Sequence, residues 1–159
     1  MMKYWRWLLL GLLLLPVSGA VAETLPPVTP DATVARGDIP EIYRWDLTPL
    51  FPSDEAWSAG RDALLGELPK LAAFEGRLGE PEALASCLDL YFELHSNANF
   101  VTRFANLRHA TALSDEAANA MVQRSLGAMD ELMSTAGFIR RELLTLPEAT
   151  LQAAYAAEP

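Results

Sequence analysis

A helical repeat over residues 81–112 constrains the fold more than any other feature of the sequence. Apolar or small side chains recur there at alternating steps of three and four residues, from Leu84 and Cys87 to Ala112, and only Arg108 interrupts them. This spacing predicts one buried face of an α-helix of about thirty residues, a rod of roughly 45 Å. Further apolar side chains are expected to widen that face: Leu88, Phe92, Phe104 and Leu107.

The same helical period appears on both sides of this segment. Ser53 is a favourable N-cap, and the face that follows it contains Trp57, Leu64, Leu68 and Leu71. Pro69 is expected to kink that helix, because its ring clashes with the carbonyl group four residues earlier. A third helix is predicted from the N-cap segment 114–116 to Leu143, and residues 145–147 start a short last helix. No alternating run of β-branched residues predicts a strand.

Residues 42–57 are rich in aromatic and aliphatic side chains, and Pro49 and Pro52 exclude a continuous helix over them. They predict an extended aromatic arm that docks on the helices, since aromatic side chains mostly bury large areas in cores. An aromatic cage for a cationic ligand is the alternative. The predicted fold class is therefore all-α: an antiparallel bundle of about three long helices plus a short C-terminal helix, with an extended aromatic N-terminal arm.

The first 22 residues have the pattern of a signal peptide. Lys3 and Arg6 precede a Leu-rich run, and Ala20 and Ala22 complete an A-x-A cleavage site. The apolar run is about half the length of a bilayer-spanning helix, although an uncleaved anchor remains the alternative. We expect export to the periplasm or the medium, with membrane contact only through the signal peptide before its cleavage. Residues 23–41 are rich in proline and predict an extended linker.

Removing the signal peptide takes away Lys3 and Arg6, so the formal net charge changes from −9 to −11. An acidic chain disfavours nucleic-acid binding, which needs clustered positive charge. His95 and His109 lie fourteen residues apart on one predicted helix, and neither belongs to a zinc motif. No phosphate loop or nucleophile elbow occurs. We therefore assign no catalytic, cofactor-binding or metal-binding residue, and we interpret Cys87 as a small core residue.

One stretch supports a more specific interpretation. Residues 39–48 read Ile-Pro-Glu-Ile-Tyr-Arg-Trp-Asp-Leu-Thr, and residues 50–57 read Leu-Phe-Pro-Ser-Asp-Glu-Ala-Trp. This order resembles the opening of oligoendopeptidase F, a member of the thimet-oligopeptidase-like zinc metallopeptidases, and the resemblance extends over roughly residues 38–159. The residues that carry its motif are Tyr43, Trp45, Asp46, Leu47, Phe51 and Trp57.

The resemblance implies that residues 42–159 are a helical N-terminal lobe. The zinc-binding His-Glu-x-x-His segment of that family does not occur in this sequence. We expect this lobe to be incomplete. Three explanations for the missing catalytic part stay open: a truncated gene, a partial record of a longer gene, or a genuine stand-alone lobe. Its partner would be a catalytic domain of the same polypeptide, which would hold the zinc and act on short peptides, and this chain alone would be inactive. The alternative is a stand-alone exported binding module without catalysis. That module would use the arm or the Met121, Met129 and Met133 series as its contact surface.

Overall fold

The computed structural model describes residues 27, 29, 31, 34 and 36–157. The chain divides into two units, residues 1–33 and 34–159, and the helices belong to the second. The signal peptide predicted over residues 1–22, with its cleavage residues Ala20 and Ala22, lies outside the described residues. Its interpretation therefore stays a prediction.

The described part of the second unit is all-α and contains no strand. Two short 3₁₀ turns, Arg36–Asp38 and Glu41–Tyr43, precede the helices. The helices are α1 (Asp54–Ala72), α2 (Pro81–Ala110), α3 (Glu116–Thr135), α4 (Gly137–Leu143) and α5 (Glu148–Ala157). Among the described residues, no helix combines the length and the apolarity that crossing a bilayer requires.

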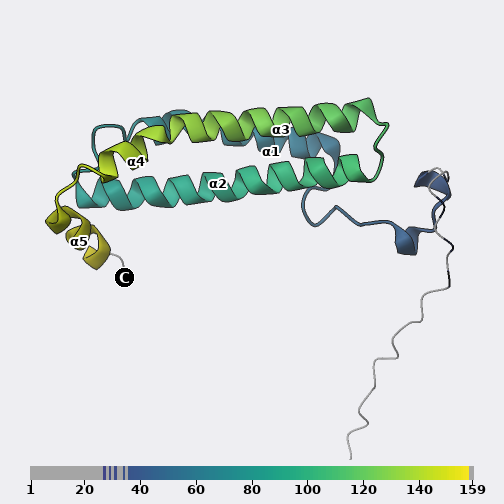
Figure 1. The fold of residues 1–159 in the computed structure, drawn as a ribbon, viewed down its shortest axis with the longest axis horizontal. Coiled ribbons are helices and arrows are strands. Elements are labelled where there is room, and N and C mark those ends of the chain that lie inside the picture. Colours follow the sequence, from purple (N-terminus) through teal and green to yellow (C-terminus); the bar gives the residue numbers. More distant parts are fainter. Residues whose placement is uncertain (1–26, 28, 30, 32–33, 35, 158–159) are drawn as a thin grey trace, which may run out of the picture. The chain divides into compact units, whose positions relative to one another are not determined.

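The three long helices lie side by side, and each contacts the other two (Figure 1). Because residues 73–80 and 111–115 are short connections, α1, α2 and α3 run antiparallel in turn. The C-terminal helix α5 packs against α2. This arrangement confirms the predicted all-α bundle.

The helix starts follow the capping pattern of the sequence. The Ser53 hydroxyl accepts a hydrogen bond of 3.1 Å from the Ala56 backbone N–H, as expected for an N-cap. Pro81 is the first residue of α2. Proline is favourable there, because a backbone N–H at that position would have no partner within the helix. In the segment 114–116 the capping residue is Asp115.

The buried faces agree closely with the predicted ones. All four residues predicted for the buried face of α1 are buried, and α2 buries seven of its predicted positions. Together with the inner face of α3 they form two apolar clusters, a large one along the bundle and a small one beside the arm. The small cluster consists of Trp57, Val101, Phe104, Ala105 and Met121.

Two details differ from the prediction. The third helix does not continue to Leu143, because it ends at Thr135 and the chain restarts as α4 at Gly137, a residue that disfavours the helix interior. Phe92 was expected to widen the buried face of α2, but its side chain is 63% exposed, since none of the described helices covers that side. Helix α1 continues through Pro69 to Ala72.

Candidate functional site

The residues that carry the family resemblance form a folded segment at the start of α1. The Asp46 carboxylate accepts hydrogen bonds from the Thr48 hydroxyl (2.7 Å) and the Thr48 backbone N–H (2.9 Å). These two bonds, the hydroxyl first, hold the pKa of Asp46 below its ordinary value. The Leu47 carbonyl then accepts from the backbone N–H of Leu50. The segment is therefore a tight turn that leads directly into α1.

The apolar residues of this segment dock on the helices, as predicted. Leu47, Leu50 and Phe51 pack against the small apolar cluster. The Phe51 ring meets the Phe104 ring edge-on, with 5.5 Å between ring centroids. Trp57 is buried, and its indole N–H donates a hydrogen bond to α2. The motif thus fastens the arm and the first turn of α1 to α2.

Two aromatic residues of the motif are less buried. Trp45 is 61% exposed, and Tyr43 is half-buried with a hydroxyl that has no hydrogen-bond partner among the described residues. Trp45 lines a hollow of about 440 Å³ that also contains Arg108. The Arg108 guanidinium already pairs with Asp54 at 3.5 Å and with Asp115 at 3.1 Å. The charge of Arg108 is therefore already paired and is not free for a ligand in this hollow.

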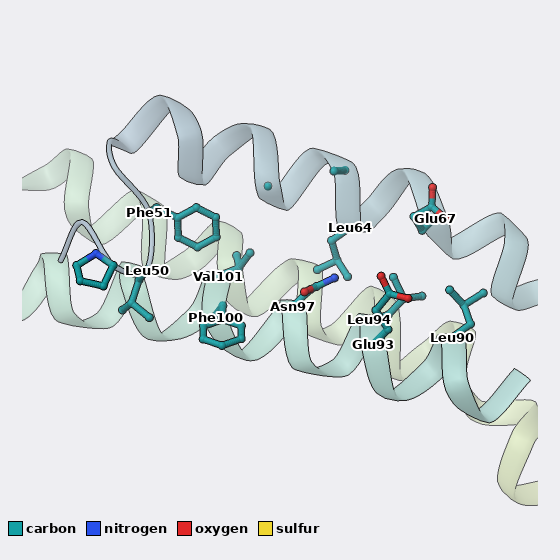
Figure 2. Close-up of a pocket in the computed structure, with 13 residues that line it drawn as sticks. Leu50, Phe51, Leu64, Glu67, Leu90, Glu93, Leu94, Asn97, Phe100 and Val101 are labelled. Carbon is teal, nitrogen blue, oxygen red and sulfur yellow. The ribbon is translucent and has the colours of Figure 1, made fainter. Parts of the chain in front are cut away.

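A larger groove, of about 580 Å³, runs between α1 and α2 and is closed at one end by the arm (Figure 2). Its volume lies in the range of ligand-binding pockets. It is lined by Pro49, Leu50, Phe51, Gly60, Ala63, Leu64, Glu67, Leu90, Glu93, Leu94, Asn97, Phe100 and Val101.

Small residues on α1 create this groove. Gly60 and Ala63 fall on the side of α1 that faces the groove, where larger side chains would fill it. A Cβ atom at Gly60 would stand 2.7 Å from Cε1 of Phe51, so glycine lets the Phe51 ring close the end of the groove. Buried Leu64 and Leu94 line the groove from α1 and α2. The groove is therefore apolar at its base.

The two ends of the groove differ in character. Figure 2 shows Leu50, Phe51 and Phe100 toward one end and the carboxylates of Glu67 and Glu93 toward the other. Lys70 pairs with Glu67 at 2.7 Å, whereas Glu93 has no ion pair among the described residues. None of the described lining residues is Lys or Arg. The groove therefore has one aromatic end and one acidic end.

The other candidate residues do not converge on a reaction site. Within the described residues, no group of three or more His, Cys, Asp or Glu side chains could hold a metal ion. The His95 ring lies against Tyr91, and its Nδ1 atom is 3.1 Å from Nδ2 of Asn99. Cys87 is fully buried in the large cluster, which agrees with its interpretation as a core residue.

The groove was not predicted from the sequence. No motif in the sequence marks Glu93 or Asn97 as residues of a groove. The available signal was the spacing of Gly60, Ala63 and Glu67 at steps of three and four, which places two small residues and a carboxylate on one side of a Leu-rich helix.

Comparisons with protein-family models, with curated proteins and with solved structures found no match to this chain. The proposals that follow rest on its sequence pattern and its geometry.

Proposed function

We propose that this chain is the N-terminal helical lobe of an exported zinc metallopeptidase similar to oligoendopeptidase F. The lobe shapes the access of short peptides to a catalytic domain elsewhere in the same polypeptide. The observation that carries the proposal is the ordered series from Tyr43 to Trp57, which resembles the opening of that family.

The local structure supports the proposal, because residues of that series fold and dock the arm. Asp46 closes a turn, Phe51 packs on Phe104, and Trp57 donates a hydrogen bond to α2, so these residues of the motif dock the arm. A docked arm gives the lobe one rigid edge. Such an edge is what a structure that restricts entry to a channel needs, since a loose segment would admit folded proteins as readily as peptides.

Zinc would belong to the catalytic domain, where it activates a water molecule for peptide hydrolysis. The described residues of this chain do not fit a zinc site, since their His, Cys, Asp and Glu side chains form no suitable group. In this proposal the part of the lobe is steric, and it limits which substrates enter.

The test uses the native polypeptide, purified from its source with an antibody raised against this chain. We expect a mass well above that of 159 residues and chelator-sensitive cleavage of short quenched fluorogenic peptides, with folded proteins left intact. The recombinant 159-residue chain, supplied with zinc, should cleave neither. A native product no larger than this chain, or chelator-sensitive cleavage by the recombinant chain, would contradict the proposal.

Export is the second part of the proposal, and it rests on residues 1–22. A fusion of the full chain to alkaline phosphatase, which folds only outside the cytoplasm, should be active in a bacterial host. Replacing Ala22 with a bulky residue should leave an uncleaved precursor of higher mass, while a substitution in the linker should not. An inactive fusion, or a product that always retains residues 1–22, would count against a cleaved signal peptide.

A second candidate function, a stand-alone exported binding module, is favoured by the groove between α1 and α2. The methionine surface once considered for such a module receives less support, because Met121 is buried and Met129 is partly buried against the core, leaving Met133 exposed. A native product of this chain's own size that binds a ligand without hydrolysing it would favour this candidate.

A further inference from the structure

We propose that the groove between α1 and α2 binds a short extended peptide that carries a basic side chain about three residues from a large apolar one. The proposal rests on the groove alone and applies whether the chain is a lobe or a stand-alone module. Three features of the groove carry it: its length, its unpaired carboxylate and its half-exposed aromatic end.

The length of the groove suits a peptide. Lining residues of α2 extend from Leu90 to Val101, which at 1.5 Å per residue is about 16 Å. An extended peptide in the polyproline II conformation rises about 3.1 Å per residue, so about five residues fill the groove. Glu93 and Phe100 lie seven residues apart on α2, or about 10 Å. That distance is about three residues of such a peptide, which is one full turn, so side chains three residues apart can both face the groove.

Charge complementarity selects the first side chain. The exposed carboxylate of Glu93 has no ion pair among the described residues, and no described lining residue is basic. Asp89 stands one helical turn before it and is also exposed, so it adds negative potential at the same end of α2. Glu67 lies across the groove on α1, and its carboxylate forms an ion pair with Lys70. A lysine or arginine of the peptide is therefore attracted to this end.

The opposite end selects the second side chain. Phe100 lines the groove at the same end as Leu50 and Phe51, and its side chain is 49% exposed, so part of its ring remains open to water. A phenylalanine or leucine of the peptide would cover this ring and bury apolar surface on both partners. The peptide therefore runs with its basic residue toward Glu93 and its apolar residue toward Phe100.

The experiment is fluorescence anisotropy of the purified full chain with a fluorescein-labelled peptide, Gly-Lys-Ala-Ala-Phe-Gly. We expect saturable binding that weakens as salt is added, because part of it is an exposed ion pair. A peptide with Glu in place of Lys, and one with Ala in place of Phe, should each bind more weakly. The mass of the peptide is measured after incubation to detect hydrolysis independently of binding. A failure of binding is therefore distinguishable from a failure of the proposed peptidase role.

Matched variants locate the site. Glu93→Gln should weaken binding about threefold, as expected for an exposed ion pair, whereas Glu131→Gln on α3 makes the same charge change away from the groove and should not. Phe100→Ala should weaken binding about tenfold. Phe92→Ala removes an exposed ring from the same helix outside the groove and should have no effect. Circular dichroism of each variant checks that it folds.

Three results would overturn the proposal. The first is no saturable binding of the Lys-Phe peptide, and the second is equal binding of the Glu-substituted peptide. The third is self-association of the chain that Phe100→Ala abolishes, measured by sedimentation without peptide, because a second copy would then be the occupant of the groove.

Discussion

The indole N–H of Trp57 donates a hydrogen bond of 2.8 Å to the backbone carbonyl of Val101, which lies 44 residues further along the chain. Both residues are buried in the small apolar cluster. This bond joins the first turn of α1 to the middle of α2 at the place where the arm docks. Trp57 therefore contributes both apolar burial and a buried polar contact to the junction of three segments.

Replacing Trp57 with phenylalanine should lower the free energy of unfolding by about 2 kcal/mol, because the hydrogen bond is lost and a small cavity remains. The measurement is urea unfolding followed by circular dichroism. Trp45→Phe is the matched control, since the Trp45 side chain is mostly exposed and should change the midpoint little. Equal effects of the two substitutions would show that the buried bond adds nothing to stability.

Much of the fold could be predicted because a single periodicity determines which side of a long helix is buried. Every residue predicted for the buried face of α1 is buried, and Ser53 caps that helix as expected. The end of α3 could not be predicted in the same way. The apolar period continues from Leu132 through Ile139, so the period alone does not show that the helix breaks at Ala136.

The groove was harder to predict, because a groove forms where the side chains of two neighbouring helices do not fill the space between them. Helical period shows which residues face a neighbour, but not how closely the neighbour approaches. The groove depends on Gly60 of α1 lying beside Phe51 of the arm, and on Phe100 of α2 staying half-exposed. Those relationships join three segments and exist only in the folded chain.

The two glycines inside α1 should respond differently to alanine. Gly66 has open space around its missing side chain, so Gly66→Ala should raise the free energy of unfolding by about 1 kcal/mol through helix propensity. Gly60→Ala brings the same gain, but its Cβ would stand 2.7 Å from the Phe51 ring. Because that ring must move, we expect less stabilisation or a net loss, measured by the same urea unfolding. Equal stabilisation by both substitutions would show that the Phe51 ring moves aside freely.

The buried thiol of Cys87 should resist chemical labelling. Burial raises the pKa of Cys87 to about 11, and the negative charge of Glu142 adds to the effect. At pH 8 only about one thiol in a thousand is then ionised in the folded chain. We expect slow reaction with iodoacetamide in buffer and fast reaction in urea, followed by intact mass. Rapid labelling of the folded chain would mean that the thiol is accessible.

The same raised pKa has a consequence for stability at high pH. The unfolded chain releases the Cys87 proton near its ordinary pKa of 9.0, while the folded chain keeps it up to about 11. The contribution to stability is therefore fully present below pH 9 and is lost as pH rises from 9 to 11. A Cys87→Ala variant, although less stable throughout, should show a shallower loss over that interval.

The cap of α3 should give the opposite dependence at low pH. The Asp115 carboxylate accepts hydrogen bonds from the backbone N–H groups of Ala118 (3.2 Å) and Ala117 (2.9 Å), and it pairs with Arg108 at 3.1 Å. These partners, Ala118 first, hold the pKa of Asp115 below its ordinary value of 3.8. The stabilising contribution is therefore present above pH 3.8 and is lost as pH falls below it, through the lowered pKa of the folded chain.

Asp115→Asn tests this dependence, because the asparagine oxygen can still cap the helix but cannot carry the charge that pairs with Arg108. At pH 7 the variant should unfold at a lower urea concentration than the parent chain. Well below pH 3.8 the two midpoints should converge, since the parent carboxylate is then protonated as well. Glu131→Gln, an exposed change on the same helix, should leave the midpoint nearly unaltered at both pH values. If the difference between Asp115→Asn and the parent stays constant with pH, the charge of Asp115 does not stabilise the fold.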